Sequence, residues 1–166
     1  IIMKVEKTPI PGVLILTPKV FEDHRGWFYE AWSDRTFKEN GLDYSFVQDN
    51  LSLSREKNTL RGLHFQREPD AQAKLVWCPR GEVLDVVVDL RKASPTYLKS
   101  FSAMLTEQNK KRLLIPRGLA HGYLTLTDHV EFAYKADRFY APENDRNVRW
   151  NDPSIQADWG GTGNPI

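Results

Sequence analysis

The sequence predicts an all-β protein, organised as a barrel or a sandwich of strands. Short segments rich in Val, Ile, Leu, Phe and Tyr follow one another along the chain, and Gly, Pro, Asn or Asp separates most of them. A single short stretch has a helical pattern. Many closely spaced strands with little helix are typical of β-barrels and β-sandwiches.

The predicted strands are spread along the chain from residue 12 to residue 136. In order they are GVLIL (12–16), GWFYEAW (26–32), YSFVQDNLSLS (44–54), TLRGLHF (59–65), KLVWC (74–78), EVLDVVVDL (82–90), SFSAML (100–105), RLLIP (112–116), GYLTL (122–126) and VEFAYKA (130–136). A short helix is predicted over 34–40, because Ser33 or Asp34 can cap its start and Gly41 can end it.

The strand predicted over 82–90 carries two acidic residues that need an explanation. Side chains alternate between the faces of a strand, so one face is apolar and Asp85 and Asp89 lie on the other; the apolar face consists of Leu84, Val86, Val88 and Leu90. Asp85 should have a hydrogen-bond or charge partner, because a buried carboxylate without one is costly. Asp89 should pair with Arg91 or a turn amide at the strand end. Structural and functional roles for Asp85 both stay open.

Length, charge and cysteine content exclude several classes of protein. The 166 residues predict one domain over 1–166, and a chain of this length can bury about 70% of its unfolded surface without a disulfide or a metal. The single cysteine, Cys78, fits a reducing cytoplasm. With 23 Lys and Arg against 22 Asp and Glu, general binding to nucleic acid or to membrane surfaces is not expected. No apolar run approaches the ~20 residues of a membrane span.

Three motifs combine polar side chains with predicted strands or turns: RGLHFQ with His64, IPRGLAHGY with His121, and EFAYK with Tyr134. A histidine with a pKa near ~6.5 can accept a proton at neutral pH, and a tyrosine with a pKa near ~10 would donate one. If Lys74 points into the same lumen, its charge can stabilise an enolate, and His121 can donate to the same oxygen. The alternative is that His121 and Tyr134 each satisfy a hydrogen bond of the core.

RGLHFQ, the turn at Gly81 and the motif formed by Pro116, Gly118 and His121 resemble the two signature regions of the cupin barrels. This resemblance implies a cupin-type, jelly-roll β-barrel with a few short helices. Metal-binding cupins place two histidines and an acid in the first region. Here Gln66 stands in the place of the second histidine, and no acid follows at a suitable spacing. Because a catalytic metal usually has three protein ligands, no metal is expected.

Longer motifs run from about residue 4 to the end of the chain: PKVFEDHRGWFYEAW, FVQDNLSLS, LRGLHFQ, AQAKLVWCPRGEVLDVVVDLRKASPTY, LLIPRGLAHGYLTL, EFAYKADRFYAP and WNDPSI. Together they resemble the dTDP-4-dehydrorhamnose 3,5-epimerase family. The resemblance implies epimerisation of dTDP-4-keto-6-deoxy-D-glucose at C3 and C5 to dTDP-4-keto-L-rhamnose, without metal or redox cofactor. It also implies a homodimer in which N-terminal strands exchange between sheets, and GVLIL is a candidate exchanging strand.

The resemblance also implies a role for each polar residue of the three motifs. His64 would abstract the proton, and Tyr134 would reprotonate the opposite face of the sugar. Lys74 would stabilise the enolate oxygen at C4. His121, paired with Asp85, would help to hold the sugar.

Further residues are implied to bind the substrate. Arg25 and Arg61 correspond to ligand-contacting arginines, whose fork of donors suits a diphosphate. The other implied binding residues are Phe21 and Phe28 at the thymine, with Glu30, Gln48, Asp49, Asn50 and Asp145. The alternatives are ordinary core packing for the two phenylalanines and surface or strand-end salt bridges for the two arginines.

Two expectations concern His64 itself. In a regular strand Arg61 and His64 face opposite sides, so a bulge at Gly62 is expected if both meet one ligand. Family members continue past the PI of WGGTGNPI into a motif whose Asp partners the catalytic histidine. This sequence ends at Ile166, and we expect that a C-terminal tail is missing after 166.

Three other functions are compatible with the sequence. One is a C3-only or C5-only epimerase acting on a related dTDP-4-keto-deoxysugar. Another is a non-catalytic cupin that binds a nucleotide sugar, although a sensor has no use for the proton relay of His64, Lys74 and Tyr134. The last is a metal-dependent dioxygenase or isomerase, against which Gln66 argues.

Overall fold

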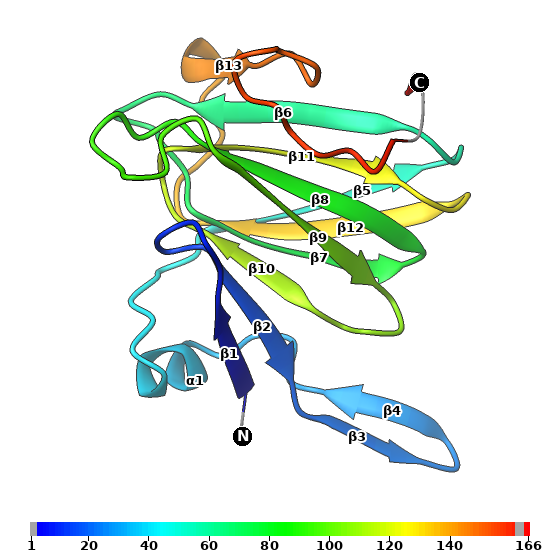
Figure 1. Cartoon of the computed structure of the whole chain (residues 1–166). Helices are drawn as coiled ribbons and strands as arrows, with labels where there is room; N and C mark the ends of the chain where they lie inside the picture. The colour runs from blue at the N-terminus through cyan, green and yellow to red at the C-terminus, as the bar shows by residue number, and fades with distance from the viewer. Residues whose placement is uncertain (1–2, 162–164) are drawn as a thin grey trace.

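The molecule is built almost entirely from antiparallel strands (Figure 1). The computed structural model describes residues 3–161 and 165–166. The strands are β1 (Met3–Lys7), β2 (Leu14–Pro18), β3 (Val20–Asp23), β4 (Gly26–Tyr29), β5 (Gln48–Ser54), β6 (Leu60–Gln66), β7 (Lys74–Arg80), β8 (Glu82–Asp89), β9 (Ser100–Thr106), β10 (Arg112–Ile115), β11 (Leu119–Thr125), β12 (Val130–Ala136) and β13 (Asp145–Asn147). The helices are α1 (Asp34–Glu39) and the 3-10 turn η1 (Pro142–Asn144).

The strands form two large sheets and a separate hairpin. The six-stranded sheet has the order β1-β2-β10-β7-β12-β5, and the five-stranded sheet has the order β13-β6-β11-β8-β9. The hairpin of β3 and β4 extends away from both sheets, at the lower right of Figure 1. The predicted all-β, cupin-type jelly roll is confirmed.

The main hydrophobic core lies between the two large sheets, and both contribute to it. Its buried members are Ile10, Val13, Val76, Cys78, Val83, Val87, Leu105, Leu113, Ile115, Leu119, Tyr123, Val130 and Phe132. Two further clusters cover the outer faces. Residues 148–159 pack on the five-stranded sheet, and α1 with residues 42–46 packs on the six-stranded sheet.

The strand β8 shows the predicted alternation. Val86 and Val88 pack in the outer cluster of the five-stranded sheet, whereas Val83 and Val87 pack in the main core. Asp85 lies on the face of the main core and is fully buried. Its carboxylate therefore points between the sheets, where it needs a partner.

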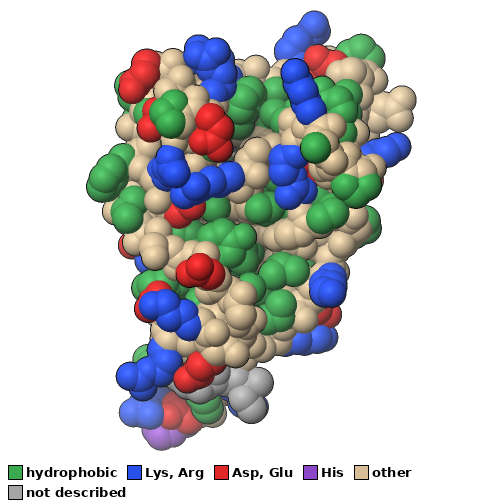
Figure 2. Space-filling model, turned by 90° about the vertical axis from the view of Figure 1, so that its left-hand side faces the viewer, with side chains coloured by type: hydrophobic (Ala, Val, Ile, Leu, Met, Phe, Trp, Pro, Cys, Tyr) green, Lys and Arg blue, Asp and Glu red, His purple; other side chains and the backbone are tan. Residues whose placement is uncertain are grey.

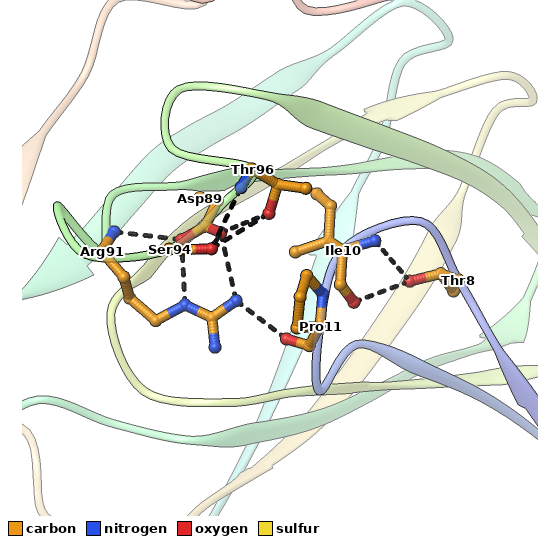
Figure 3. A network of polar contacts seen from close by, with 7 residues as sticks. All are labelled: Thr8, Ile10, Pro11, Asp89, Arg91, Ser94 and Thr96. Atoms are coloured by element: carbon orange, nitrogen blue, oxygen red, sulfur yellow. Dashed lines mark hydrogen bonds and ion pairs between the residues drawn. The ribbon is translucent and has the colours of Figure 1, made fainter.

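Asp89 is the last residue of β8, and its carboxylate accepts a network of hydrogen bonds (Figure 3). Arg91 donates to its carboxylate from the main chain at 3.0 Å and from Nε at 2.9 Å, and Ser94 and Thr96 donate through their hydroxyls at 2.6 and 2.7 Å. Arg91 also donates from Nη2 to the carbonyl of Pro11 at 2.8 Å. The predicted pairing of Asp89 is confirmed, and it ties the N-terminal turn to the end of β8.

The short helix α1 begins and ends close to where the sequence predicts. The Ser33 side chain accepts a hydrogen bond from the amide of Thr36, which caps the first turn. Gly41 follows the helix with φ of 73°, the left-handed conformation in which chains commonly leave a helix. Phe37 packs from the helix onto the outer face of the six-stranded sheet.

All the predicted strands are present, with shifted ends in several cases. The strand predicted over 44–54 begins at Gln48. Before it, Phe46 packs against Trp32 and Phe37, and Tyr44 stacks on Phe46, instead of pairing in the sheet. The sequence missed β1, β3 and β13. Their side chains are mostly exposed or half-buried, so they give no clear alternation of apolar and polar residues.

The surface carries charges of both signs. Figure 2 shows one face, on which acidic and basic side chains are mixed and hydrophobic patches lie between them. Several large apolar side chains are exposed, among them Phe28 at 69% and Leu51 at 69%. Among the described residues, neither helix has the length and apolar character needed to cross a membrane.

Candidate active site

A cavity of about 540 Å³ opens between the two large sheets, on the side where β5 and β6 lie. Its size falls within the usual range for small-molecule sites, roughly 300–1,000 Å³. Its lining residues are Ser52, Leu60, Arg61, Gly62, His64, Phe65, Gln66, Gln72, Lys74, His121, Tyr123, Tyr134, Tyr140 and Asp145. Strands distant in the sequence therefore place the histidines, the lysine and the tyrosine of the three motifs around one space.

His64 and His121 lie side by side on neighbouring strands, and both line the cavity. The two residues are paired in the register of β6 with β11, and the register shifts between His121 and Tyr123. Gly62 lies at this irregularity with φ of 112°. A Cβ on Gly62 would lie 2.6 Å from the carbonyl oxygen of His121, so the close approach requires glycine. The predicted irregularity at Gly62 is present, and Arg61 and His64 both line the cavity.

The surroundings of His64 favour its neutral form. Burial lowers the pKa of the imidazole, and the positive charge of Lys74 lowers it further. Asp145 and the side chain of Asn147 oppose this shift from β13, which pairs with β6. The net direction is a lowered pKa, which leaves His64 able to accept a proton at neutral pH.

Lys74 lies beside Tyr134, with its Nζ 5.1 Å from the centroid of the phenol ring. Burial lowers the pKa of Lys74 to about 8, although Asp145 and Asp85 favour its charged form. Burial raises the pKa of Tyr134, and a hydrogen bond with Asn50 acts in the opposite direction. At neutral pH the lysine is therefore mainly charged and the tyrosine keeps its proton.

His121 and Asp85 form a buried pair inside the cavity wall. Nε2 of His121 lies 2.7 Å from Oδ2 of Asp85, and the side chains are 7% and 0% exposed. Burial raises the pKa of Asp85, while His121 and Lys74 lower it. The partner that the strand pattern required for Asp85 is therefore His121.

Arg61 lines the cavity from the beginning of β6. It donates from Nε to Ser54 Oγ and from Nη2 to the carbonyl of Leu53, both at 3.0 Å. Asp145 lies opposite Gln66 on β13 and lines the same space. No acidic partner of Arg61 lies within salt-bridge distance among the described residues.

Three residues proposed for substrate binding lie away from this cavity. Phe21, Arg25 and Phe28 belong to the β3–β4 hairpin, which Figure 1 shows at the opposite end of the molecule from β6 and β13. They form a separate exposed hollow of about 510 Å³, together with Trp27. Arg25 pairs there with Asp23 at 2.5 Å. Within one chain, these three residues therefore lie away from His64.

The remaining proposed residues make contacts within the chain. Glu30 accepts a hydrogen bond from the Thr36 hydroxyl at 2.6 Å, and Asp49 pairs with Lys135 at 2.9 Å. Gln48 donates to the side chain of Asn50 at 3.1 Å. None of these four proposed residues lines the cavity of His64.

Several cavity residues were not singled out from the sequence. Tyr123 lies two residues after His121 on the same strand, so the alternation of side chains could have placed both on one face. Its hydroxyl lies 2.8 Å from that of Ser52, another lining residue. Gln72 and Tyr140 lie in loops, and no local pattern in the sequence points to them.

No group of three His, Cys, Asp or Glu side chains in the described residues is arranged to hold a metal ion. Gln66 lines the cavity where a metal-binding cupin would have a histidine, but its carboxamide bonds to the main chain.

Comparisons with known proteins agree on one family. A family model described as dTDP-4-dehydrorhamnose 3,5-epimerase matches residues 7–166. An enzyme of that name from Salmonella typhimurium is 52% identical over 158 residues, covering 95% of this chain and 86% of the relative.

Solved structures show the same similarity. A dTDP-4-dehydrorhamnose 3,5-epimerase from Bacillus anthracis, bound to TDP and PPi, has a TM-score of 0.96 at 42% identity, covering 99% of this chain and 94% of that one. A dTDP-6-deoxy-D-glucose-3,5-epimerase from Legionella pneumophila, in complex with dTDP-4-keto-L-rhamnose, has a TM-score of 0.94 at 39% identity. The alignment with the Legionella enzyme covers 99% of this chain and 87% of that one.

Proposed function

Because the chain belongs to the dTDP-4-dehydrorhamnose 3,5-epimerase family, we propose that it inverts C3 and C5 of dTDP-4-keto-6-deoxy-D-glucose to give dTDP-4-keto-L-rhamnose. The observation that carries the proposal is the convergence of His64, Lys74 and Tyr134 on one cavity. These three side chains supply a base, a cation and a proton donor.

The reaction uses the acidity that the C4 ketone gives to its neighbours. Neutral His64 removes the proton from C3 or C5, and the electron pair moves onto O4 as an enolate. The charge of Lys74 stabilises that oxygen, and His121 donates a hydrogen bond to it. Tyr134 returns a proton to the opposite face of the same carbon, which inverts the centre.

The protonation states support this assignment. The lowered pKa of His64 keeps the base unprotonated, and the raised pKa of Tyr134 keeps the acid protonated. Lys74 has a pKa of about 8, so it is positively charged in most of the protein molecules at neutral pH. Each group is therefore in its working form before the substrate binds.

We also propose that the enzyme works as a homodimer in which the hairpin of one subunit reaches the cavity of the other. Phe21, Arg25 and Phe28 resemble substrate-binding residues, yet they lie far from the cavity of their own chain. The strand β5 is an edge of the six-stranded sheet and exposes Leu51 and Leu53. An exposed apolar edge strand favours pairing with a strand of a second chain.

Exchange with heavy water tests the main proposal. The protein is incubated with dTDP-4-keto-6-deoxyglucose in D₂O, and deuterium is measured at C3 and C5. Label at both carbons is expected. Label at one carbon would indicate the single-position epimerase, and label at neither would refute the enzymatic function on this substrate.

Two controls accompany the exchange experiment. His64→Ala should abolish exchange at both carbons with little loss of binding, and unchanged exchange would refute its role as the base. Metal analysis of the active protein should find no stoichiometric ion, and treatment with a chelator should leave the exchange rate unchanged.

A further inference from the structure

Gln66 lines the cavity, and its side-chain amide bonds to main-chain atoms. The side chain is 6% exposed and sits at the end of β6. Its Nε2 donates to the carbonyl of Asp70 at 2.7 Å and to the carbonyl of Phe139 at 3.3 Å, and its Oε1 accepts from the amide of Ala141 at 2.9 Å. One buried carboxamide therefore bonds to the main chain of two separate loops.

These two loops, 67–73 and 137–144, meet beside the cavity. Gln72 donates to the carbonyl of Arg138 at 2.8 Å, and Asn144 donates to the carboxylate of Asp70 at 2.7 Å. The residues of these outer bonds are half-buried, whereas Gln66 is buried. Gln66 thus joins the loops from the side of the cavity.

Tyr140 lies between the two residues of the second loop that Gln66 holds. Its own amide donates to Oε1 of Gln48 at 3.1 Å, so glutamine side chains bond to the main chain at three consecutive positions. The Tyr140 side chain lines the cavity and is 58% exposed. Loops are more mobile than the strands they connect, so main-chain bonds at these positions limit how far the ring can move with its loop.

We propose that Gln66 is a positioning residue that holds Tyr140 at the mouth of the cavity, where the ring contacts the bound sugar nucleotide. This rests on the proposed function. Glutamine fits the task because its amide has both a donor and an acceptor, and an ionised glutamate has no donor. Gln66 takes no part in the proton transfer, so its loss weakens substrate binding more than it slows the chemistry.

Steady-state kinetics of two variants test the proposal. Gln66→Met removes all three hydrogen bonds at similar volume, and KM is expected to rise about tenfold while kcat stays within about twofold. Gln66→Glu keeps the shape of the side chain and its hydrogen-bond acceptor, so it is the second test variant if Gln66→Met fails to fold. Burial beside two carbonyl oxygens raises the pKa of that glutamate. Its KM should therefore fall toward the wild-type value as the pH is lowered and the carboxyl regains a donor.

A double variant shows whether Gln66 acts through Tyr140. If it does, Gln66→Met combined with Tyr140→Ala should have no higher KM than Tyr140→Ala alone. Additive increases in KM would overturn the proposal. An unchanged KM in the Gln66 variants would also overturn it, and so would a loss of kcat at constant KM.

Asn109 offers a matched control. Its carboxamide accepts from the amides of Thr106 and Lys111 at 3.0 and 2.9 Å and donates to the carbonyl of Met104 at 2.9 Å. It lies outside the cavity lining. Asn109→Ala should lower thermal stability without raising KM. An equal rise of KM would show that general destabilisation explains the Gln66 variants and would overturn the proposal.

The same assays separate the two proposals. Absence of label with the wild-type protein refutes the proposed function. Label with the wild type, together with unchanged KM in the Gln66 variants, refutes only the role of Gln66.

Discussion

His64 and His121 are register partners on β6 and β11, and they reach one cavity because Gly62 lets the two strands approach closely. The first histidine has Lys74 and Asp145 as its charged neighbours, and the second has the buried carboxylate of Asp85. The same residue type is therefore held in two environments, one suited to proton transfer and one to holding a fixed orientation.

A side chain at position 62 should disrupt this relationship. In Gly62→Ala the new methyl group meets main-chain atoms of β11, which cannot move aside as a flexible side chain would. We expect kcat to fall by about 100-fold, because a displacement near 1 Å between catalytic groups has that effect. Gly41→Ala is the control, since Gly41 also has positive φ but has open space around it. Equal losses of activity in both variants would contradict the explanation.

Asp85→Asn should slow the reaction while leaving the fold intact. The substitution keeps the shape but removes the charge that orients His121 across 2.7 Å. We expect kcat to fall about 100-fold, which is the effect of losing one hydrogen-bond donor to the enolate oxygen, with a smaller change in KM. Deuterium exchange at C3 and C5 should slow together. An unchanged kcat would mean that the pair serves the core alone.

The pH profile of kcat/KM should be bell-shaped, with limbs set by two groups. Neutral His64 is the active form, so activity should fall as the pH drops through its pKa, which lies below the ordinary value of about 6.5. Charged Lys74 is the active form, so activity should fall as the pH rises through about 8. In Lys74→Arg the alkaline limb should disappear, because arginine stays protonated. An alkaline limb that persists near the same pH would contradict the assignment to Lys74.

The hydrogen bonds to Asp89 should make the free energy of unfolding depend on pH. Burial raises the pKa of Asp89, but hydrogen bonds from Arg91, Ser94 and Thr96 lower it more, so the folded value lies well below normal. Because the pKa of Asp89 is lower in the folded state than in the unfolded state, its charged form stabilises the fold at pH values above the unfolded pKa of about 3.9. This contribution is lost as the pH falls from there toward the folded pKa. Asp89→Asn should lower the free energy of unfolding by about 2–3 kcal/mol at pH 7, and by less at pH 3.

Denaturant unfolding at the two pH values measures this difference. Asp34→Asn is the control, because its ion pair with Lys38 is exposed and should contribute little at either pH. A loss in Asp89→Asn that is equal at pH 7 and pH 3 would show that the carboxylate charge is not the source of the stability.

Complementation tests the shared site of the proposed dimer. His64→Ala and Arg25→Ala should each be inactive or weak alone. After the two are unfolded and refolded together, random pairing should restore about one quarter of the sites, because one cavity of each mixed dimer has both residues. No recovery in a mixture that has refolded as dimers would refute a site shared between subunits.

The sequence by itself determined ten of the thirteen strands of the described residues, the short helix α1 and the polar motifs, and it missed β1, β3 and β13. Alternation in EVLDVVVDL placed Asp85 on an interior face and required a partner for it, because burial of a charge follows from local pattern. The missing histidine at Gln66 argued against a metal for the same local reason. The resemblance of the motifs then identified the family.

Only the tertiary structure decided how those pieces meet. The pairing of β6 with β11 is set by contacts between residues about sixty positions apart, so the shared cavity of Arg61 and His64 could not be read from their spacing. The hairpin carrying Arg25 lies away from that cavity, although its sequence resembles a binding motif. The bonds that Gln66 makes to two loops depend on main-chain positions that no side-chain pattern encodes.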